Sequence, residues 1–449
     1  MLLRTVSRAV LALIAAATLG AQVPASRPPG SNAAPSAAVA SDPLHAAGRS
    51  VTISLLTMGN GEQVWELFGH AAIWIHDNTT GRDTVFNWGV FDPRQPNFIL
   101  HFLKGRMLYQ MGGDSMNQLL YAYRYFNRTV SSQQLDLTTA QKDSLLHLIQ
   151  INALPQNRQY LYDYFQNNCS TRPRDLLDQV LGGQLHAASM TVSERSYRWH
   201  ALRLMQGGKP LVVGVDVGLG EPSDRPATRW QEMFLPKELH DAVATLQVRD
   251  STGATHPLVA NEQVLYQSTR PAEPTAPPHL APWLTAIGVV VAALFAWLGT
   301  RAGSGARGAR VAAAIAMGLW SFLAGLLGVV LTILWTVTDH IFAHANENLL
   351  LFNPLWLVLA VLLPVYYLSG RATRATRAVA LVLAGLCAVA LLAHLVTLSR
   401  QSNLALVGLA LPPALAILWA VVNGTQRSPR VSAVITAPAT QPVTPRRAT

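Results

Sequence analysis

Five long apolar segments in the C-terminal part of this 449-residue chain limit its fold more than any other feature. They cover residues 283–300, 311–336, 350–368, 378–398 and 404–422. Each is close to, or longer than, the roughly 20 apolar residues that cross the hydrocarbon core of a bilayer. Helices in the core of a soluble domain seldom run this far without a charge. The sequence therefore predicts five transmembrane helices over residues 283–422.

The charges between these segments predict which side of the membrane each loop faces. The loop 338–349 carries Asp339 and Glu347 but no Lys or Arg. Arginines gather instead in the loops 301–310 and 369–377 and in the tail 423–449. Because Lys and Arg collect on the cytoplasmic side, the residues before the first span are predicted to lie outside the inner membrane, in the periplasm. The net charge of +10 is largely explained by this topology and does not indicate nucleic-acid binding.

The N-terminus has the pattern of a secretory signal. Arg4 and Arg8 precede an apolar stretch over 9–20 that is too short for an ordinary span, and small residues follow. We predict a signal peptide over 1–25, with a retained N-terminal anchor as the alternative. The Pro-, Ala-, Ser- and Gly-rich residues 26–48 are predicted to be a disordered linker. A Pro-rich hinge over 269–282 then leaves 49–268 as the periplasmic domain, and 423–449 as a cytoplasmic tail.

The two cysteines of the chain, Cys169 and Cys387, are too few for a disulfide framework. Cys387 lies within an apolar segment and is interpreted as packing. Cys169 precedes a predicted helix that Ser170 or Thr171 caps and that Gly182 and Gly183 end. A helix N-terminus favours a thiolate, and Arg172 and Arg174 are expected to act in the same direction. The alternative is a buried cysteine that only packs.

A nucleophilic cysteine needs a base, and His70 is the best-placed histidine. Residues 70–76 alternate as in a strand, residues 77–82 form a turn, and "DTVFNWGVF" forms a second strand, which together predict a hairpin. Asn87 on the second strand reaches His70 in one register, whereas a slip of one residue turns it to the other face. His76 is the second candidate for the base. Taken alone, His70 is better explained as a core histidine, and only its combination with Cys169 favours a catalytic pair.

The remaining segments carry less information. The stretch 98–109, "FILHFLKGRMLY", is expected either at the lipid surface or in the core. Residues 209–220 are predicted to be a strand and a turn, and residues 227–248 a helix followed by a strand.

The order of these motifs resembles a known family. A histidine at the start of a strand, a polar residue on the next strand and a cysteine before a helix resemble the circularly permuted papain-like fold, an order that lecithin:retinol acyltransferase shares. The stretches "FGHAAI", "FNWGVFD", "NFILHFLKGRMLY", "SSQQLDLT" and "YDYFQNNCSTRPRD" resemble the periplasmic domain of the Lnb-type lipoprotein N-acyltransferases. The stretch "TDHIFAHANENLLLFNPLW" is similar to a loop of that family. The implied fold class is an α+β permuted papain-like periplasmic domain followed by an all-α bundle of five transmembrane helices.

The resemblance implies roles for individual residues. Cys169 corresponds to the nucleophile and His70 to the base, and Asn87 is our assignment for the group that orients the imidazole. The backbone N–H of Cys169 is the default oxyanion donor, with Asn168 or Gln166 as side-chain helpers. Arg172 and Asp175 are expected to form a structural pair.

Four polar residues of the loop 338–349 are candidates for contact with a lipid head group or the acceptor; they are His340, His344, Asn346 and Asn348. Helix capping and anchoring at the interface are equally good explanations of them. Two histidines four residues apart also raise the question of zinc, but no third ligand is evident nearby, so neither a metal nor a cofactor is predicted.

The implied activity is a membrane-bound acyltransferase that acts without a cofactor. It would move an acyl chain from a phospholipid through a thioester on Cys169 to the α-amino group of a diacylglyceryl-cysteine lipoprotein. The expected partners are thus a phospholipid donor, a lipoprotein acceptor and the membrane. Two other classes stay open: a papain-like cysteine hydrolase (a phospholipase, or a cell-wall amidase or peptidase), and a non-catalytic membrane binding module.

Overall fold

The computed structural model describes residues 48–423 except 92–95, 207–208, 251 and 372. The predicted signal peptide, nearly all of the linker and nearly all of the cytoplasmic tail lie outside the described residues. The chain divides into two compact units. The first joins the residues up to Asp216 with Pro222–Pro278 and Thr338–Ile341. The second joins Val217–Glu221, His279–Val337 and the residues from Phe342 onward.

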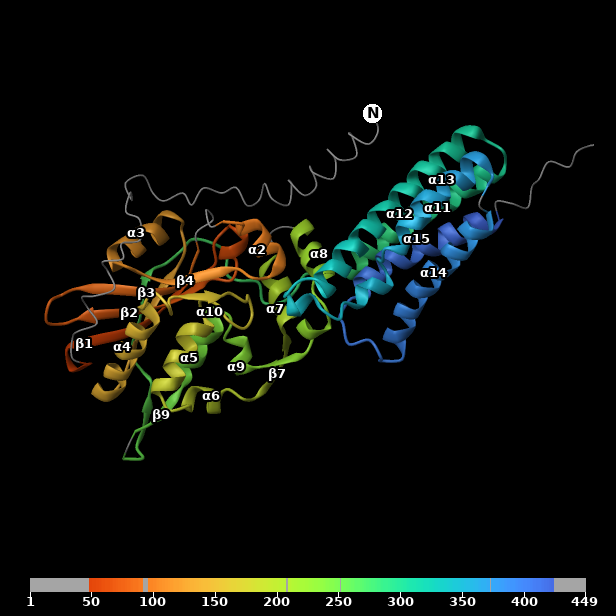
Figure 1. Ribbon diagram of the computed structural model, residues 1–449. Helices are drawn as coiled ribbons and strands as arrows, with labels where there is room; N and C mark the ends of the chain where they lie inside the picture. The colour runs from red at the N-terminus through yellow and green to blue at the C-terminus, as the bar shows by residue number, and fades with distance from the viewer. Residues whose placement is uncertain (1–47, 92–95, 207–208, 251, 372, 424–449) are drawn as a thin grey trace, which may run out of the picture. The chain divides into compact units, whose positions relative to one another are not determined.

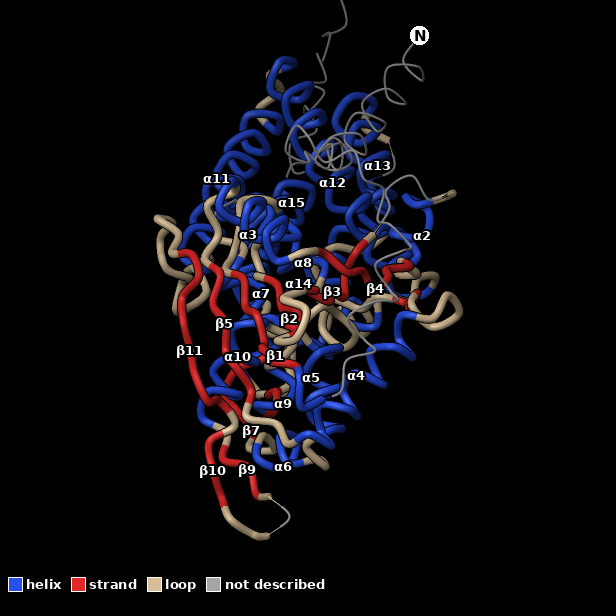
Figure 2. Tube along the Cα trace, turned by 90° about the vertical axis from the view of Figure 1, so that its left-hand side faces the viewer, coloured by secondary structure: helices blue, strands red, loops and turns tan. Residues whose placement is uncertain are grey.

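A seven-stranded antiparallel sheet forms the centre of the first unit (Figure 2). Its strand order is β11-β5-β1-β2-β3-β4-β6. The strands are β1 (Val51–Met58), β2 (His70–Asp77), β3 (Asp83–Val90), β4 (Leu108–Asp114), β5 (Val130–Leu135), β6 (Gln159–Leu161) and β11 (Val259–Tyr266). The predicted hairpin is confirmed, since β2 pairs with β3 across the turn at 78–82.

Helices cover both faces of this sheet (Figure 1). On one face, Ile73 and Ile75 pack with residues of α4 (Thr139–Ala153), α5 (Thr171–Val180) and α10 (Pro236–Thr245). On the other face, Ala72 and Val85 pack with Met116 and Leu119 of α3 (Met116–Tyr125). Because side chains alternate along a strand, β2 buries residues on both faces. His70 lies at the start of β2, on the Ala72 face.

Short elements complete the first unit. They are η3 (Gly48–Ser50), η4 (Val64–Glu66), α2 (Phe98–Lys104), α6 (Gln184–Ala188), β7 (Val192–Ser196), α7 (Tyr197–Leu204), most of α8 (Lys209–Gly218) and of η5 (Glu221–Ser223), β8 (Pro226–Thr228), α9 (Arg229–Glu232), β9 (Gln247–Arg249) and β10 (Thr255–Pro257). The prediction of one helix followed by a strand over 227–248 is correct in part: β9 follows as predicted, but the helix is divided into α9 and α10, because Leu235 before Pro236 is extended.

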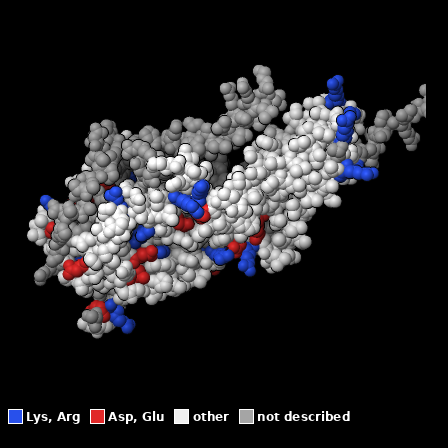
Figure 3. Space-filling view, in the orientation of Figure 1, with Lys and Arg blue, Asp and Glu red and all other residues white. Residues whose placement is uncertain are grey.

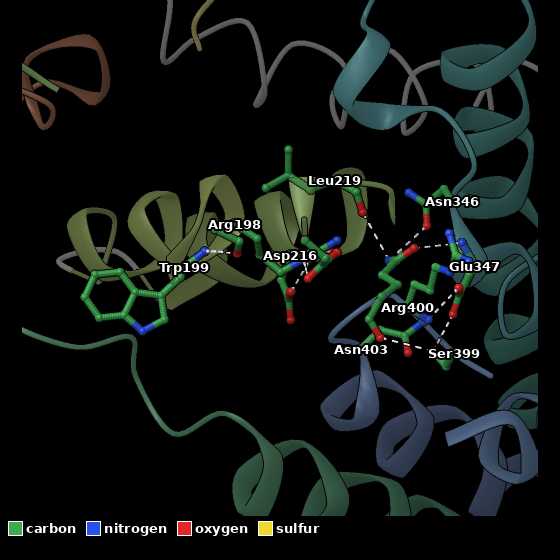
Figure 4. A network of polar contacts seen from close by, with 12 residues as sticks. Arg198, Trp199, Asp216, Leu219, Asn346, Glu347, Ser399, Arg400 and Asn403 are labelled. Atoms are coloured by element: carbon green, nitrogen blue, oxygen red, sulfur yellow. Dashed lines mark hydrogen bonds and ion pairs between the residues drawn. The ribbon is translucent and has the colours of Figure 1, made fainter. Parts of the chain in front are cut away.

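The prediction of a strand and turn over 209–220 is wrong, because α8 occupies most of this segment. Val212 and Asp216 are both buried and lie four residues, about one helical turn, apart, so they share one face of α8. The buried guanidinium of Arg198 donates to the Asp216 carboxylate (2.8 Å) and to its carbonyl oxygen (2.6 Å) (Figure 4). Alternating valines concealed this helical period in the sequence.

Among the described residues, the C-terminal part of the chain contains five segments long and apolar enough to cross a membrane. Four of them are the single helices α11 (Ala281–Gly303), α12 (Arg307–Thr336), α14 (Thr373–Leu395) and α15 (Leu404–Asn423). The third span runs over Ile341–Ser369 and joins η6 (Ile341–Ala343), η7 (Glu347–Leu350) and α13 (Leu355–Ser369). Lys and Arg side chains gather at one end, beyond a long surface without charged side chains (Figure 3). The predicted fold class, an α+β domain followed by five spans, is confirmed.

The start of α13 differs from the prediction. Helix α13 itself begins at Leu355, whereas the apolar segment begins at residue 350. Pro354 disfavours a helical conformation at the residue before it, and the side chain of that residue, Asn353, accepts a hydrogen bond from the Leu355 N–H (3.2 Å). These two residues set the first turn of the helix.

Candidate functional site

Cys169 lies on the turn that leads from β6 into α5, and Asn168 holds this turn. The Asn168 side-chain oxygen accepts hydrogen bonds from the backbone N–H groups of Ser170 (2.8 Å) and Thr171 (2.9 Å). Its amide nitrogen donates to the carbonyl oxygens of Tyr164 and Phe234, both at 3.0 Å. Ser170 occupies the N-cap position of α5 as predicted, but its side chain makes no cap bond, and the Asn168 oxygen supplies the cap instead. The Asn168 side-chain amide is occupied by these bonds.

His70 and Asn87 meet across the β2–β3 pair. Ala72 is the register partner of Asn87, so His70 and Asn87 share one face of the sheet. Nε2 of His70 lies 3.0 Å from the side-chain oxygen of Asn87. An amide oxygen only accepts hydrogen bonds, so Nε2 carries the proton and Nδ1 is the nitrogen left to act as a base. The register in which Asn87 reaches His70 is the one the chain adopts.

Asp114 at the end of β4 orients the Asn87 amide. Nδ2 of Asn87 donates to Asp114 Oδ2 (3.2 Å) and to the Val85 carbonyl oxygen (3.4 Å). These bonds point the amide oxygen at His70. No sequence motif marks Asp114, because its position depends on the pairing of β3 with β4.

Gly89 lies where Cys169 and His70 approach each other. A Cβ on Gly89 would lie 3.3 Å from Cys169 Cβ and 3.8 Å from His70 Cε1. Gly89 has φ +112°, and the β3–β4 register shifts between Trp88 and Val90, as expected of a β-bulge. The bulge and the missing side chain leave room for the cysteine beside the imidazole. A glycine inside a strand was the available sequence signal for this close approach.

The structure thus brings Cys169, His70 and Asn87 into one cluster. Both Cys169 and His70 are partly exposed at the surface. His76 lies at the far end of β2, where its Nδ1 bonds Asp83 Oδ1 (2.8 Å), so it does not belong to this cluster.

Burial dominates the electrostatics of the pair. It raises the pKa of the Cys169 thiol to about 11, although the N–H groups of Ala71 and Cys169 and the charge of Arg128 act in the opposite direction. Burial also lowers the pKa of His70 to about 4; the Asn87 hydrogen bond opposes this and Arg128 adds to it. The resting site therefore holds a neutral thiol and a neutral imidazole. Our expectation of a thiolate stabilised by the helix N-terminus is wrong, because desolvation outweighs that effect.

The two arginines after Cys169 have other contacts. The Arg172 guanidinium lies 4.2 Å from the Tyr160 ring centroid, and its Nε donates to Asn167 Oδ1 (2.6 Å). Arg174 pairs with Asp175 (2.7 Å). The predicted Arg172–Asp175 pair is therefore wrong, and the neighbouring arginine takes that role.

Arg128 is the cation that acts on the site. It is 6% exposed, donates to the Gly59 carbonyl oxygen (2.9 Å), pairs with Glu66 (3.3 Å) and lies 4.8 Å from the Tyr123 ring centroid. It follows α3 in a stretch without any catalytic motif, so sequence reasoning missed it.

Aromatic side chains line the surroundings of the cysteine. Tyr109 stacks on Tyr162 with ring centroids 4.1 Å apart, and Phe91 stacks on Tyr109 at 5.1 Å. Burial raises the pKa of Tyr109 to about 12, and the nearby Cys169 adds to that rise. These neutral rings offer an apolar wall of the kind that an acyl chain contacts favourably.

Three other predicted contact residues, Gln166, His340 and His344, lie outside the cluster of Cys169, His70 and Asn87. Gln166 is exposed on the cysteine turn, where its backbone N–H donates to Asp163 Oδ1 (2.8 Å). His340 belongs to the first unit and His344 to the second. The predicted roles of Gln166 and both histidines stay predictions.

Asn346 and Asn348 are buried in the second unit. Their amide nitrogens donate to the Val217 carbonyl oxygen at 2.9 and 3.0 Å, and Asn348 also accepts from Asn403 (2.8 Å). Next to them, Glu347 accepts from the Arg400 N–H (3.1 Å) (Figure 4). These bonds fit the alternative of a structural role, and substrate contact by the two asparagines stays a prediction.

A model described as the Lnb N-terminal periplasmic domain matches residues 45–205, and a model described as the Lnb transmembrane domain matches residues 280–424. No curated protein and no solved structure matches the chain. The fold and the two matches define a multi-pass membrane protein with a periplasmic α+β domain. The chain belongs to the Lnb family, and this membership indicates an enzyme that modifies membrane lipoproteins.

Proposed function

We propose that this protein is a thiol acyltransferase that moves an acyl chain from a phospholipid to the α-amino group of a diacylglyceryl-cysteine lipoprotein. The observation that carries the proposal is the cluster of Cys169, His70 and Asn87 in a chain with five apolar spans. The Lnb resemblance supports the choice of substrates. Both substrates are held in the membrane, so a tethered enzyme meets them in two dimensions.

The first half-reaction forms a thioester. Cys169 Sγ attacks the ester carbonyl carbon while His70 Nδ1 takes the thiol proton. The C–S bond forms and the ester C–O bond breaks, and His70 returns the proton to the leaving alkoxide of the lysophospholipid. Because the thiol and imidazole are both neutral at rest, proton transfer accompanies attack rather than preceding it. Asn87 steadies the imidazolium that forms in between.

The second half-reaction transfers the chain to nitrogen. The neutral α-amino group attacks the thioester carbonyl, the C–N bond forms and the C–S bond breaks. His70 takes a proton from the amine and returns it to the Cys169 sulfur, which restores the neutral pair. In both halves the backbone N–H of Cys169 is the expected oxyanion donor, with the exposed Gln166 as the side-chain helper. Asn168 is the weaker candidate because its amide already holds the turn.

A cysteine hydrolase is the alternative that shares the first half-reaction. In a hydrolase, water replaces the amine and the acyl chain leaves as a fatty acid. The five spans favour a lipid substrate over soluble cell-wall peptides, but they suit a phospholipase equally well. The fate of the thioester separates these two activities.

The experiment is intact-mass analysis of the purified full chain after incubation with phospholipid in detergent. Wild type is compared with Cys169→Ser and with the matched control Cys387→Ser, which changes the other cysteine. We expect a gain of one acyl chain in wild type and in Cys387→Ser but not in Cys169→Ser, removable by neutral hydroxylamine. A diacylglyceryl-cysteine peptide should then remove the adduct and gain the acyl chain.

Two outcomes would contradict the proposal. Release of lysophospholipid and fatty acid, with no transfer to the peptide, would identify a hydrolase. A folded sample with neither adduct nor turnover would favour a binding module.

A further inference from the structure

The short helix α2 exposes an unusual amount of apolar surface. Four of its seven residues are large, apolar and about half exposed: Ile99 (57%), Leu100 (48%), Phe102 (52%) and Leu103 (57%). At 100° per residue these four side chains span an arc of about 160°. His101, on the opposite side, is less exposed. A helix on a soluble domain normally turns such an arc toward the core, so this arc calls for a partner.

A short piece of the membrane part of the sequence is bonded to α2 within the first unit. The Asp339 N–H donates to the Lys104 carbonyl oxygen (2.9 Å), and the Asp339 carboxylate pairs with Arg106. The His340 Nε2 lies 3.1 Å from the Phe102 carbonyl oxygen. Gly105 permits this approach, since a Cβ there would lie 3.0 Å from the backbone nitrogen of His340. Thr338–Ile341 is thus fixed on the C-terminal end of α2.

Covalent connection places α2 near the membrane surface. The α12 span ends at Thr336, only two residues before Thr338, and two residues of extended chain reach about 7 Å. The apolar sequence continues through Trp335 and Val337, and tryptophan is enriched at the membrane–water boundary. The exposed Lys104 suits the same boundary, where an ammonium group meets lipid phosphates.

We propose that α2 dips its apolar arc into the outer leaflet of the membrane. The occupant of this surface is lipid. Ile341, which is 41% exposed, extends the apolar surface beyond the helix. The proposal does not rest on acyl transfer, because it concerns only where the periplasmic domain meets the bilayer.

The same contact orders the approach to the candidate site. The His340 ring lies against the Tyr164 ring, with centroids 6.2 Å apart and planes inclined by 29°. Tyr164 is five residues before Cys169, and its carbonyl oxygen accepts from Asn168. Insertion of α2 would therefore bring the cysteine turn to the level of the lipid head groups, where the ester bonds of a phospholipid lie.

The test measures the depth of α2 in a bilayer. A cysteine is introduced as Leu103→Cys in the full chain carrying Cys169→Ser and Cys387→Ala, and a fluorophore is attached to it in nanodiscs. Thr255→Cys is the matched control, because Thr255 is exposed on β10 and β11 begins beside it at the end of the sheet away from His70. The background lacks the candidate nucleophile, so the measurement is independent of activity.

We expect nitroxide lipids to quench the Leu103 label strongly and aqueous iodide to quench it weakly, with the reverse order at Thr255. Equal quenching at the two positions by both reagents would overturn the proposal. A Leu103 label protected from iodide but not reached by lipid nitroxides would mean that protein covers α2, and this would also overturn it.

A second measurement links the contact to turnover. Leu103→Glu places a charge in the arc, whereas Leu103→Met keeps it apolar. We expect the glutamate variant to lose at least about tenfold of its acyl-enzyme formation from bilayer phospholipid. Formation from a water-soluble short-chain ester should be unchanged. Equal rates from bilayer phospholipid in the two variants would contradict the proposal, and so would an equal loss on both substrates, because the effect of the charge would then not depend on the bilayer.

Discussion

Gly89 leaves the space in which Cys169 and His70 approach each other. Replacement by alanine adds a Cβ 3.3 Å from Cys169 Cβ at a φ of +112°. The expected result for Gly89→Ala is a loss of about 100-fold in acyl-enzyme formation, because displacing a reacting group by about 1 Å has effects of this size. Mass spectrometry of the acyl-enzyme against time provides the rate.

Gly81→Ala is the control for backbone strain. Gly81 has φ +69° in the turn between the same two strands, with no atom within 4 Å of a built Cβ. We expect it to lower stability modestly, by about 1 kcal/mol, and to leave the acylation rate unchanged. Equal loss of rate in both variants would show that strain in β3, rather than crowding at the cysteine, sets the effect.

The neutral state of the Cys169–His70 pair predicts an unusual pH profile. The pKa of His70 is about 4, so the imidazole is unprotonated and able to accept a proton above that pH. The pKa of Cys169 is about 11, so the thiolate population still grows with pH at pH 10. Alkylation of Cys169 by iodoacetamide, in a Cys387→Ala background, should rise steadily from pH 7 to pH 10. A plateau between pH 6 and pH 8 would instead indicate a preformed thiolate–imidazolium pair.

Among single residues, sequence analysis selected those whose side-chain chemistry is distinctive. Cys169 and His70 stand out because thiol and imidazole are uncommon groups in informative local settings, and Asn87 follows from strand alternation. Gly89 acts through a β-bulge, and Asp114 acts through the register that places it beside Asn87. Arg128 acts as a buried charge near the site. A glycine inside a strand was a sequence signal for the bulge at Gly89, whereas the positions of Asp114 and Arg128 depend on long-range pairing that one-dimensional patterns do not contain.

The stability of helix α5 depends on the hydrogen bonds that the Asn168 side chain makes at its N-terminus. Asn168→Ala removes two hydrogen bonds to the helix N-terminus and two to carbonyl oxygens. We expect a loss of about 2–3 kcal/mol in the stability of the periplasmic domain and a misplaced Cys169. Thermal unfolding and acylation rate both measure the change.

Thr138→Ala is the matched variant on another helix. Thr138 caps α4 through the Gln141 N–H (3.3 Å) and forms a capping box with it. Its loss should cost about 1 kcal/mol and leave acylation unchanged. If Thr138→Ala slowed acylation as much as Asn168→Ala does, the role of Asn168 in placing the cysteine would be refuted.

Helices and strands were predicted correctly where the spacing of apolar residues fitted only one of the two. The β2–β3 hairpin shows alternation and a polar turn, and the five spans exceed the length of ordinary core helices. Helix α8 was missed because Val212, Val213, Val215 and Val217 mimic a strand, while the helix is held by the tertiary pairing of Arg198 with Asp216. Tertiary contacts can outweigh local preference in this way.

At the scale of the whole molecule, a periplasmic domain tethered to five spans restricts which substrates it meets. The apolar spans and the basic loops together predicted this topology, because the bilayer imposes length and charge rules on any sequence. The assignment of Thr338–Ile341 to the first unit was not predictable, since it depends on contacts with α2 that no pattern encodes.

The tether predicts that the donor must lie in the same bilayer as the enzyme. The full chain is reconstituted into vesicles of ether lipid, which lacks a cleavable ester, with ester phospholipid either in the same bilayer or in separate vesicles. We expect acyl-enzyme only in the first case, because a phospholipid leaves its bilayer far more slowly than it diffuses within it. A water-soluble short-chain ester should acylate Cys169 equally in both samples and so controls for enzyme integrity. Equal acylation from the separate vesicles would mean that the site takes its donor from the aqueous side, and the spans would then serve anchoring alone.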